Sequence, residues 1–141
     1  MYLFSYYNAG IRIKDLLQLR NLNIKSGRLE YEMDKTGHIK SIPLNKKALK
    51  ILAIYYDKEA DPKHYFFPVL DNDTEFAEYI TYQEKKKMSF ELRKKLFNAI
   101  SSHTAQVNNN LKIISDKIEL ESPITFHTSR HSFAEKAWKI R

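Results

Sequence analysis

The sequence predicts an α+β fold, a mainly helical domain that carries a small three-stranded antiparallel sheet. Over residues 22–44 hydrophobic side chains alternate with polar ones, which is the period of half-buried strands. Elsewhere hydrophobic residues recur at spacings of three and four, which is the period of amphipathic helices. With 141 residues, 43% of them hydrophobic, the chain is long enough to bury a core. We therefore expect one domain over residues 1–141.

The sheet is expected from the segments 22–24, 28–33 and 38–44. Inward positions alternate in the second and third segments, as at Leu29, Tyr31 and Met33. Ser26-Gly27 and Thr36-Gly37 supply the turns between them. Lys35 then lies at the tip of the second hairpin, where a long ammonium side chain can reach a ligand bound elsewhere, although turn lysines often serve only solubility.

The helices are expected over residues 2–7, 13–19, 46–56, 89–118 and from 128 onward. Asn45 is the expected N-terminal cap of the third of these helices. The polar run Ser101-Ser102-His103-Thr104 predicts a break of the fourth into two helices, with His103 in the loop or at a cap. Residues 65–70 suit the core, whereas residues 75–87 are charged, poorly patterned and expected to be mobile or partly helical.

The composition limits the classes of function. Lysine and arginine number 24 against 17 acidic residues, a net charge of +7, which favours an anionic partner such as nucleic acid. The chain has no cysteine, which excludes disulfides and thiol catalysis and fits a reducing compartment. It has no apolar run of membrane-spanning length, no signal peptide pattern and no glycine-rich phosphate loop. We expect a soluble, cytoplasmic protein without a membrane partner or nucleotide hydrolysis.

The segment Ile124–Ala134 gathers His127, Arg130 and His131 around the start of a helix expected near Thr128. Unpaired N–H groups at a helix start favour anions, an arginine fork matches phosphate oxygens, and a histidine can move a proton near neutral pH. This pattern predicts a phosphate-handling site, and the competing interpretation is an ordinary solvated helix start. The expected core face of the helix is Phe133 with Ala137. A metal site is not expected, because no cysteine and no third ligand accompany the two histidines.

A second unusual position is Arg12, directly after Gly10-Ile11 and at the entrance of a helix. An arginine there is electrostatically unfavourable unless an anion or a carboxylate compensates its charge. Asp15, one turn later, could orient the guanidinium, and a simple surface pair of these two residues is the alternative.

The run Asn108-Asn109-Asn110 could present amides to a DNA backbone.

These motifs occur in a recognisable order. Ala-Gly-Ile-Arg12-Ile-x-Asp-Leu-Leu-x-Leu precedes a hairpin Lys35-Thr-Gly, and Ile-Thr-Phe-His127-x-x-Arg130-His-Ser-Phe-Ala follows. The ordered set closely resembles the catalytic domain of the tyrosine recombinases, also called phage integrases. The resemblance spans the chain from Tyr2 to Trp138.

The resemblance implies site-specific DNA recombination, as in the integration and excision of a mobile element. A tyrosine attacks a phosphodiester of double-stranded DNA and forms a 3′-phosphotyrosine, with no metal or other cofactor. Arg12 and Arg130 resemble the two arginines that clamp the non-bridging oxygens. Lys35 resembles the hairpin lysine that protonates the departing 5′ oxygen, and His127 the histidine that acts as acid or base. By the same resemblance, Asp15 and His131 contact the catalytic residues beside them and help to hold these residues in place.

Two parts of the family pattern have no counterpart here. The second histidine or tryptophan position and the nucleophilic tyrosine lie downstream of His-x-x-Arg in the family, whereas no tyrosine follows Tyr82 in this chain. The N-terminal core-binding domain also has no counterpart. We therefore expect a partial catalytic domain that forms no covalent DNA adduct alone and is monomeric, while the parent protein acts as a homotetramer on DNA. The alternatives are a non-catalytic DNA-binding remnant that occupies recombination sites and an inert remnant.

Overall fold

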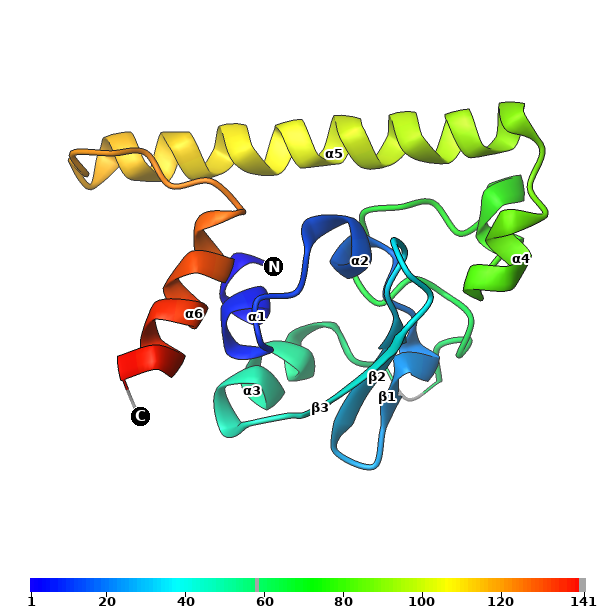
Figure 1. The fold of residues 1–141 in the computed structure, drawn as a ribbon, viewed down its shortest axis with the longest axis horizontal. Coiled ribbons are helices and arrows are strands. Elements are labelled where there is room, and N and C mark those ends of the chain that lie inside the picture. The colour runs from blue at the N-terminus through cyan, green and yellow to red at the C-terminus, as the bar shows by residue number, and fades with distance from the viewer. Residues whose placement is uncertain (58, 140–141) are drawn as a thin grey trace.

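The computed structural model describes residues 1–57 and 59–139. Figure 1 shows a small sheet and several short helices on one side of a long helix. The helices are α1 (Tyr2–Tyr7), α2 (Ile13–Leu17), α3 (Lys46–Tyr55), α4 (Tyr82–Lys86), α5 (Phe90–Lys117) and α6 (Thr128–Lys139), and the 3-10 turns are η1 (Asn21–Asn23) and η2 (Glu75–Glu78). The strands are β1 (Ile24–Lys25), β2 (Arg28–Glu32) and β3 (Ile39–Pro43).

The three strands form an antiparallel sheet in the order β1-β2-β3. Leu29 lies opposite Ile24 on one side and Ile42 on the other, as the alternating pattern predicts. The inward side chains Leu29 and Tyr31 of β2 are buried. The fold class, α+β with a small three-stranded antiparallel sheet, is confirmed.

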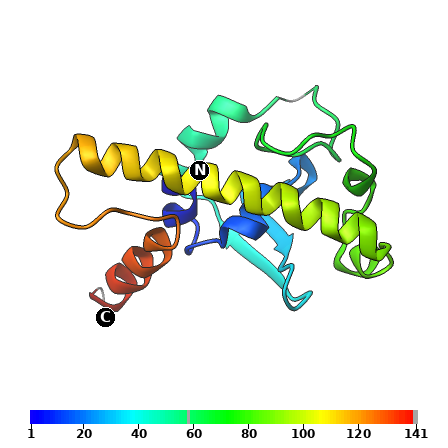
Figure 2. The same ribbon diagram turned by 90° about the horizontal axis from the view of Figure 1, so that it is seen from above.

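Helix α5 crosses one side of the domain over α1 and α2 (Figures 1 and 2). It contributes to both hydrophobic clusters of the core. Leu92, Leu96 and Ile100 pack with Leu17, Tyr65 and their neighbours, whereas Leu111 packs with the cluster around Phe4, Phe67 and Phe126. This one helix therefore ties the part of the molecule near α4 to the part near α6.

The predicted break in α5 is wrong, because α5 runs without interruption from Phe90 to Lys117. Within the expected break, the Thr104 hydroxyl donates to the Ile100 carbonyl at 2.7 Å. A Ser or Thr hydroxyl that donates to the backbone carbonyl one turn earlier has its hydrogen-bond partner within the helix. Buried apolar residues on either side keep the polar stretch helical. His103 is accordingly a helical residue and not a loop or capping residue.

Helix α6 begins at Thr128, as predicted, but its expected core face is only partly present. Phe133 is half-buried, Ala137 is exposed and Trp138 is 77% exposed. The buried residue of α6 is Ser129, which faces α1. A small side chain at this contact lets the two helices approach closely.

The charged segment 75–87, expected to be mobile or partly helical, is partly helical and forms η2 and α4. Phe76 and Ala77 are buried, and Thr81 and Glu84 form a reciprocal capping box at the start of α4. Over the described ranges of the chain, no helix has both the length and the apolar composition required to cross a bilayer.

Candidate active site

The candidate site begins with the turn that ends α1. Ala9 and Gly10 both adopt left-handed backbone angles, with φ of 59° and 65°. The Gly10 N–H donates to the Ser5 carbonyl at 2.8 Å, a bond that closes the C-terminus of a helix in the Schellman arrangement. This turn directs Ile11 and Arg12 toward α6.

The two ends of the chain approach each other closely at Gly10. A Cβ atom added there would lie 3.0 Å from the Arg130 Cα and 3.2 Å from its Cγ. Beside this contact, the hydroxyls of Ser5 and Ser129 lie 2.9 Å apart, and both side chains are fully buried. The absence of a side chain at Gly10 therefore allows the turn and the first turn of α6 to meet, which brings Arg12 near Arg130.

Arg12, His127 and Arg130 line one pocket of about 310 Å³. The rest of its wall comes from the start of α2, from α5 and from the loop before α6, through Ile13, Thr104, Asn108, Thr125 and Phe126. This set of described lining residues includes two arginines and a histidine but no carboxylate. The pocket thus presents positive charge to an anion, and three of the four predicted catalytic residues meet there.

Backbone N–H groups at the start of α6 are not the free donors expected from the sequence. The N–H groups of Thr128, Ser129 and Arg130 donate to the carbonyls of residues 125–127 at 3.0 to 3.1 Å. The donors that face the pocket are therefore mainly side chains. The amide of Asn108, predicted to point outward, instead accepts from the Phe126 N–H at 2.8 Å and holds the loop before His127.

His131 lies beside His127, on the exposed side of α6. The ring centroids are 4.5 Å apart and the rings are nearly perpendicular. His131 does not line the pocket, so it contacts the pocket residue His127 without facing the pocket itself. Within residues 1–57 and 59–139, no three acidic or histidine side chains gather in a way that could hold a metal ion.

Asp15 is buried and forms no ion pair with Arg12 among the described residues, which argues against the simple surface pair. Its carboxylate accepts from the Asp34 N–H at 2.8 Å. Burial raises the pKa of Asp15, and the hydrogen bond from Asp34 opposes this rise. Asp15 therefore supports the hairpin that carries Lys35, and acts on Arg12 only through its charge.

Tyr31 is a residue of this region that the sequence did not single out as functional. It is 6% exposed on the central strand β2. Burial raises the pKa of Tyr31 to about 12 and the charge of Asp15 adds to the rise, while the charges of Arg130 and Arg12 act against it. Both guanidinium groups therefore influence one phenol, and this phenol stays protonated at neutral pH. The sequence marks Tyr31 only as an inward position of a strand.

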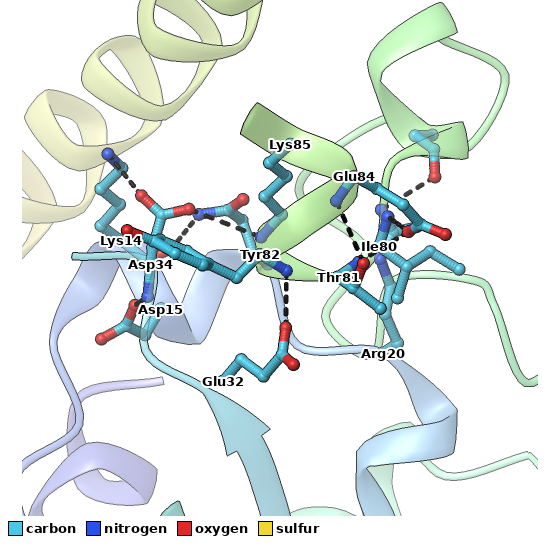
Figure 3. Close-up of polar contacts among 12 residues, drawn as sticks. Lys14, Asp15, Arg20, Glu32, Asp34, Ile80, Thr81, Tyr82, Glu84 and Lys85 are labelled. Carbon is cyan, nitrogen blue, oxygen red and sulfur yellow. Dashed lines mark hydrogen bonds and ion pairs between the residues drawn. The ribbon is translucent and has the colours of Figure 1, made fainter. Parts of the chain in front are cut away.

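Lys35 is exposed at the tip of the β2–β3 hairpin, as predicted, and does not line the pocket. The preceding residue, Asp34, contacts Lys14 at 2.6 Å and Lys85 at 3.5 Å. Figure 3 shows these two lysines approaching Asp34 from α2 and α4. No sequence motif marks Asp34 or Lys85, because the contact depends on the fold.

One of three comparisons with known proteins gives a match. A family model described as the phage integrase family matches residues 2–138. No curated protein and no solved structure gives a significant match. The matched range includes the whole pocket and every element of the fold except the last residue of α6. The chain therefore belongs to the phage integrase family, the tyrosine recombinases, whose reaction is site-specific DNA recombination.

Proposed function

We propose that Arg12 and Arg130 together bind one phosphate of double-stranded DNA, at the position where the parent protein cuts and rejoins the strand. The observation that carries this proposal is that both arginines line one pocket, although they come from opposite ends of the chain. Two guanidinium groups can each donate to the non-bridging oxygens of one phosphate, where negative charge increases during phosphoryl transfer.

In this proposal the other side chains supply protons. His127 lines the same pocket, and an imidazole group can act as an acid or a base. Lys35 reaches the departing 5′ oxygen from the hairpin tip, and an ammonium group can protonate an alkoxide as the bond breaks. The strand is cut through a phosphotyrosine. None of the tyrosines of this chain, the last of which is Tyr82, holds the nucleophile's place in the motif order.

Binding to DNA should depend strongly on salt, because each neutralised phosphate releases counterions. The parent protein is proposed to act as a homotetramer on DNA, and this chain alone to bind as a monomer. The net charge of +7 supports attraction to the duplex but does not locate the contact.

The test is fluorescence anisotropy of a labelled duplex at several salt concentrations, with Arg12→Ala and Arg130→Ala. Each substitution should weaken binding about tenfold, since a hydrogen bond to a charged group contributes about 1.5–3 kcal/mol. Each should also reduce the salt slope by about one. The matched control is Arg28→Ala, an exposed arginine of β2 whose guanidinium donates to Ser41 and which does not line the pocket.

Equal affinities of the Arg130→Ala and Arg28→Ala variants would contradict the proposal. Salt-dependent binding that needs Arg130, without a covalent adduct from the full-length parent, would instead identify a non-catalytic DNA-binding remnant. The adduct is measured with a suicide duplex and denaturing electrophoresis.

A further inference from the structure

The hairpin that carries Lys35 is held at its tip by two helices. The Asp34 carboxylate contacts the ammonium groups of Lys14 on α2, at 2.6 Å, and Lys85 on α4, at 3.5 Å. The Asp34 N–H donates to the Asp15 carboxylate of α2 at 2.8 Å. Figure 3 shows that these contacts converge on Asp34, the residue directly before Lys35.

Helix α4 also contacts the hairpin at two further points. The Tyr82 N–H donates to the Glu32 carboxylate near the end of β2. On the other arm, a Cβ atom added to Gly37 would lie 2.5 Å from the Tyr82 ring, so this ring lies directly against the turn. Three residues of the hairpin thus contact two residues of α4, although α4 lies far from the hairpin in the sequence.

The contacts at Asp34 are largely removed from water. The side chains of Asp34 and Lys85 are only 14% and 18% exposed, whereas Lys14 is 50% exposed. Burial lowers the pKa of Lys85, and the charge of Asp34 opposes this effect. Burial also disfavours the charged form of Asp34, but the hydrogen bond from Lys14 and the charge of Lys85 outweigh it and hold the pKa of Asp34 below its usual value. The carboxylate therefore stays ionised and bound.

The short segment from Arg12 to Asp15 contributes to both parts of the proposed site, the phosphate-binding pocket and the hairpin that carries Lys35. Arg12 is the residue before α2, and Lys14 and Asp15 follow within its first turn. The segment that carries the phosphate-binding arginine therefore also anchors the hairpin with the lysine. A group that transfers a proton to a leaving oxygen needs a defined position, because small displacements of reacting groups lower rates strongly.

We propose that Lys85 and Lys14 are positioning residues for Lys35, because by holding Asp34 from two helices they fix the β2–β3 hairpin before DNA binds. Helix α4 acts as a strut between the hairpin and the N-terminus of α5. This inference rests on the proposed contact of Lys35 with DNA, and goes beyond it by naming the residues that place this lysine.

The first experiment measures backbone amide hydrogen exchange at residues 34–38 in the free protein. Asp34→Asn, which keeps the size of the side chain and weakens both contacts, should speed exchange of these amides about tenfold. Lys85→Met should have a smaller effect, since Lys14 remains. The control is Lys87→Met, an exposed lysine at the end of the same helix, which should change nothing. Unchanged exchange in Asp34→Asn would overturn the inference, and if Lys85→Met fails to fold, Asp34→Asn alone decides.

The second experiment tests whether the contacts of α4 with the hairpin change the contribution of Lys35 to DNA binding. It is a double-mutant cycle in which duplex affinity is measured. Lys35→Ala should weaken binding about fivefold in the wild-type chain but less than twofold in the Lys85→Met chain, since a mobile lysine contributes less. Lys85→Arg should restore the full effect. Equal effects of Lys35→Ala in both backgrounds, or no effect in the wild type, would overturn the inference.

The proposed function and the proposed positioning of Lys35 can be refuted independently of each other. If Arg130→Ala leaves DNA binding unchanged, the proposed function fails, while faster exchange in Asp34→Asn would still show the strut. If Arg130→Ala abolishes binding but the Lys35 cycle shows no coupling, only the role of the strut fails.

Discussion

The contact between Gly10 and Arg130 gives the sharpest prediction about the site. Replacing Gly10 with alanine places a methyl group 3.0 Å from the Arg130 Cα and 3.2 Å from its Cγ, in a backbone with φ of 65°. The backbone of α6 must then move by a few tenths of an ångström, and the Arg130 guanidinium moves with it. Gly27→Ala is the matched control, because Gly27 has φ of 73° and nothing within 4 Å of its added Cβ.

The expected free energies follow from these two environments. The left-handed backbone costs alanine about 1–2 kcal/mol at either position. Overpacking adds about 1–3 kcal/mol at Gly10 only. The free energy of unfolding should therefore fall by about 1–2 kcal/mol in Gly27→Ala and by about 2–5 kcal/mol in Gly10→Ala, taking these two contributions as additive. A displaced guanidinium should also reduce duplex affinity about tenfold in Gly10→Ala alone, a change that corresponds to about 1.4 kcal/mol.

The assays are urea denaturation followed by circular dichroism, and anisotropy with a labelled duplex at one fixed salt concentration. Both are run at a temperature where each variant is folded. If Gly10→Ala and Gly27→Ala lose the same stability and bind DNA equally well, the close contact does not position Arg130 and the reasoning is refuted.

Three further predictions concern the supports of the site. Ala9→Gly should raise the free energy of unfolding by about 0.5–1 kcal/mol, because Ala9 occupies a left-handed position that glycine adopts without cost; a lower urea midpoint would contradict this. Asp34→Asn should lower the free energy of unfolding by about 1.5–3 kcal/mol at neutral pH. Since the folded pKa of Asp34 is lowered, this difference from the wild type should persist above the unfolded pKa of about 4 and vanish as the pH falls through the folded pKa. Urea titrations at pH 7 and pH 3 test the sign. Asn108→Ala should cost about 1 kcal/mol of stability, because the half-buried Phe126 N–H loses its acceptor, and thermal melts that match the wild type would disprove this role.

Local patterns predict those elements whose determinants are close together in the sequence. The sheet follows from alternation at Leu29 and Tyr31 and from the glycine turns, and α3 follows from its Asn45 cap, whose side chain accepts from the N–H groups of Lys47 and Ala48. In each case the residues that stabilise the element lie within or next to it, so a window of a few residues contains the necessary information.

The remaining features depend on contacts between distant segments. Helix α5 continues through Thr104 because the residues on either side pack on both core clusters. Helix α4 is held in place by the Glu32 carboxylate, which accepts from the Tyr82 N–H 50 positions away. The pocket itself depends on the approach of Ser5 to Ser129, 124 positions apart. Motif order suggested that Arg12 and Arg130 act together, but only the fold shows that they line one pocket.

The most direct measurement of the central claim is a double-mutant cycle between these two arginines. Duplex affinity is measured for the wild type, Arg12→Ala, Arg130→Ala and the double variant at one salt concentration. If both side chains bind the same phosphate, the double variant should lose clearly less than the sum of the single losses, with a coupling energy of about 0.5–3 kcal/mol. Strict additivity of the two losses, or full affinity of the double variant, would contradict a shared phosphate site.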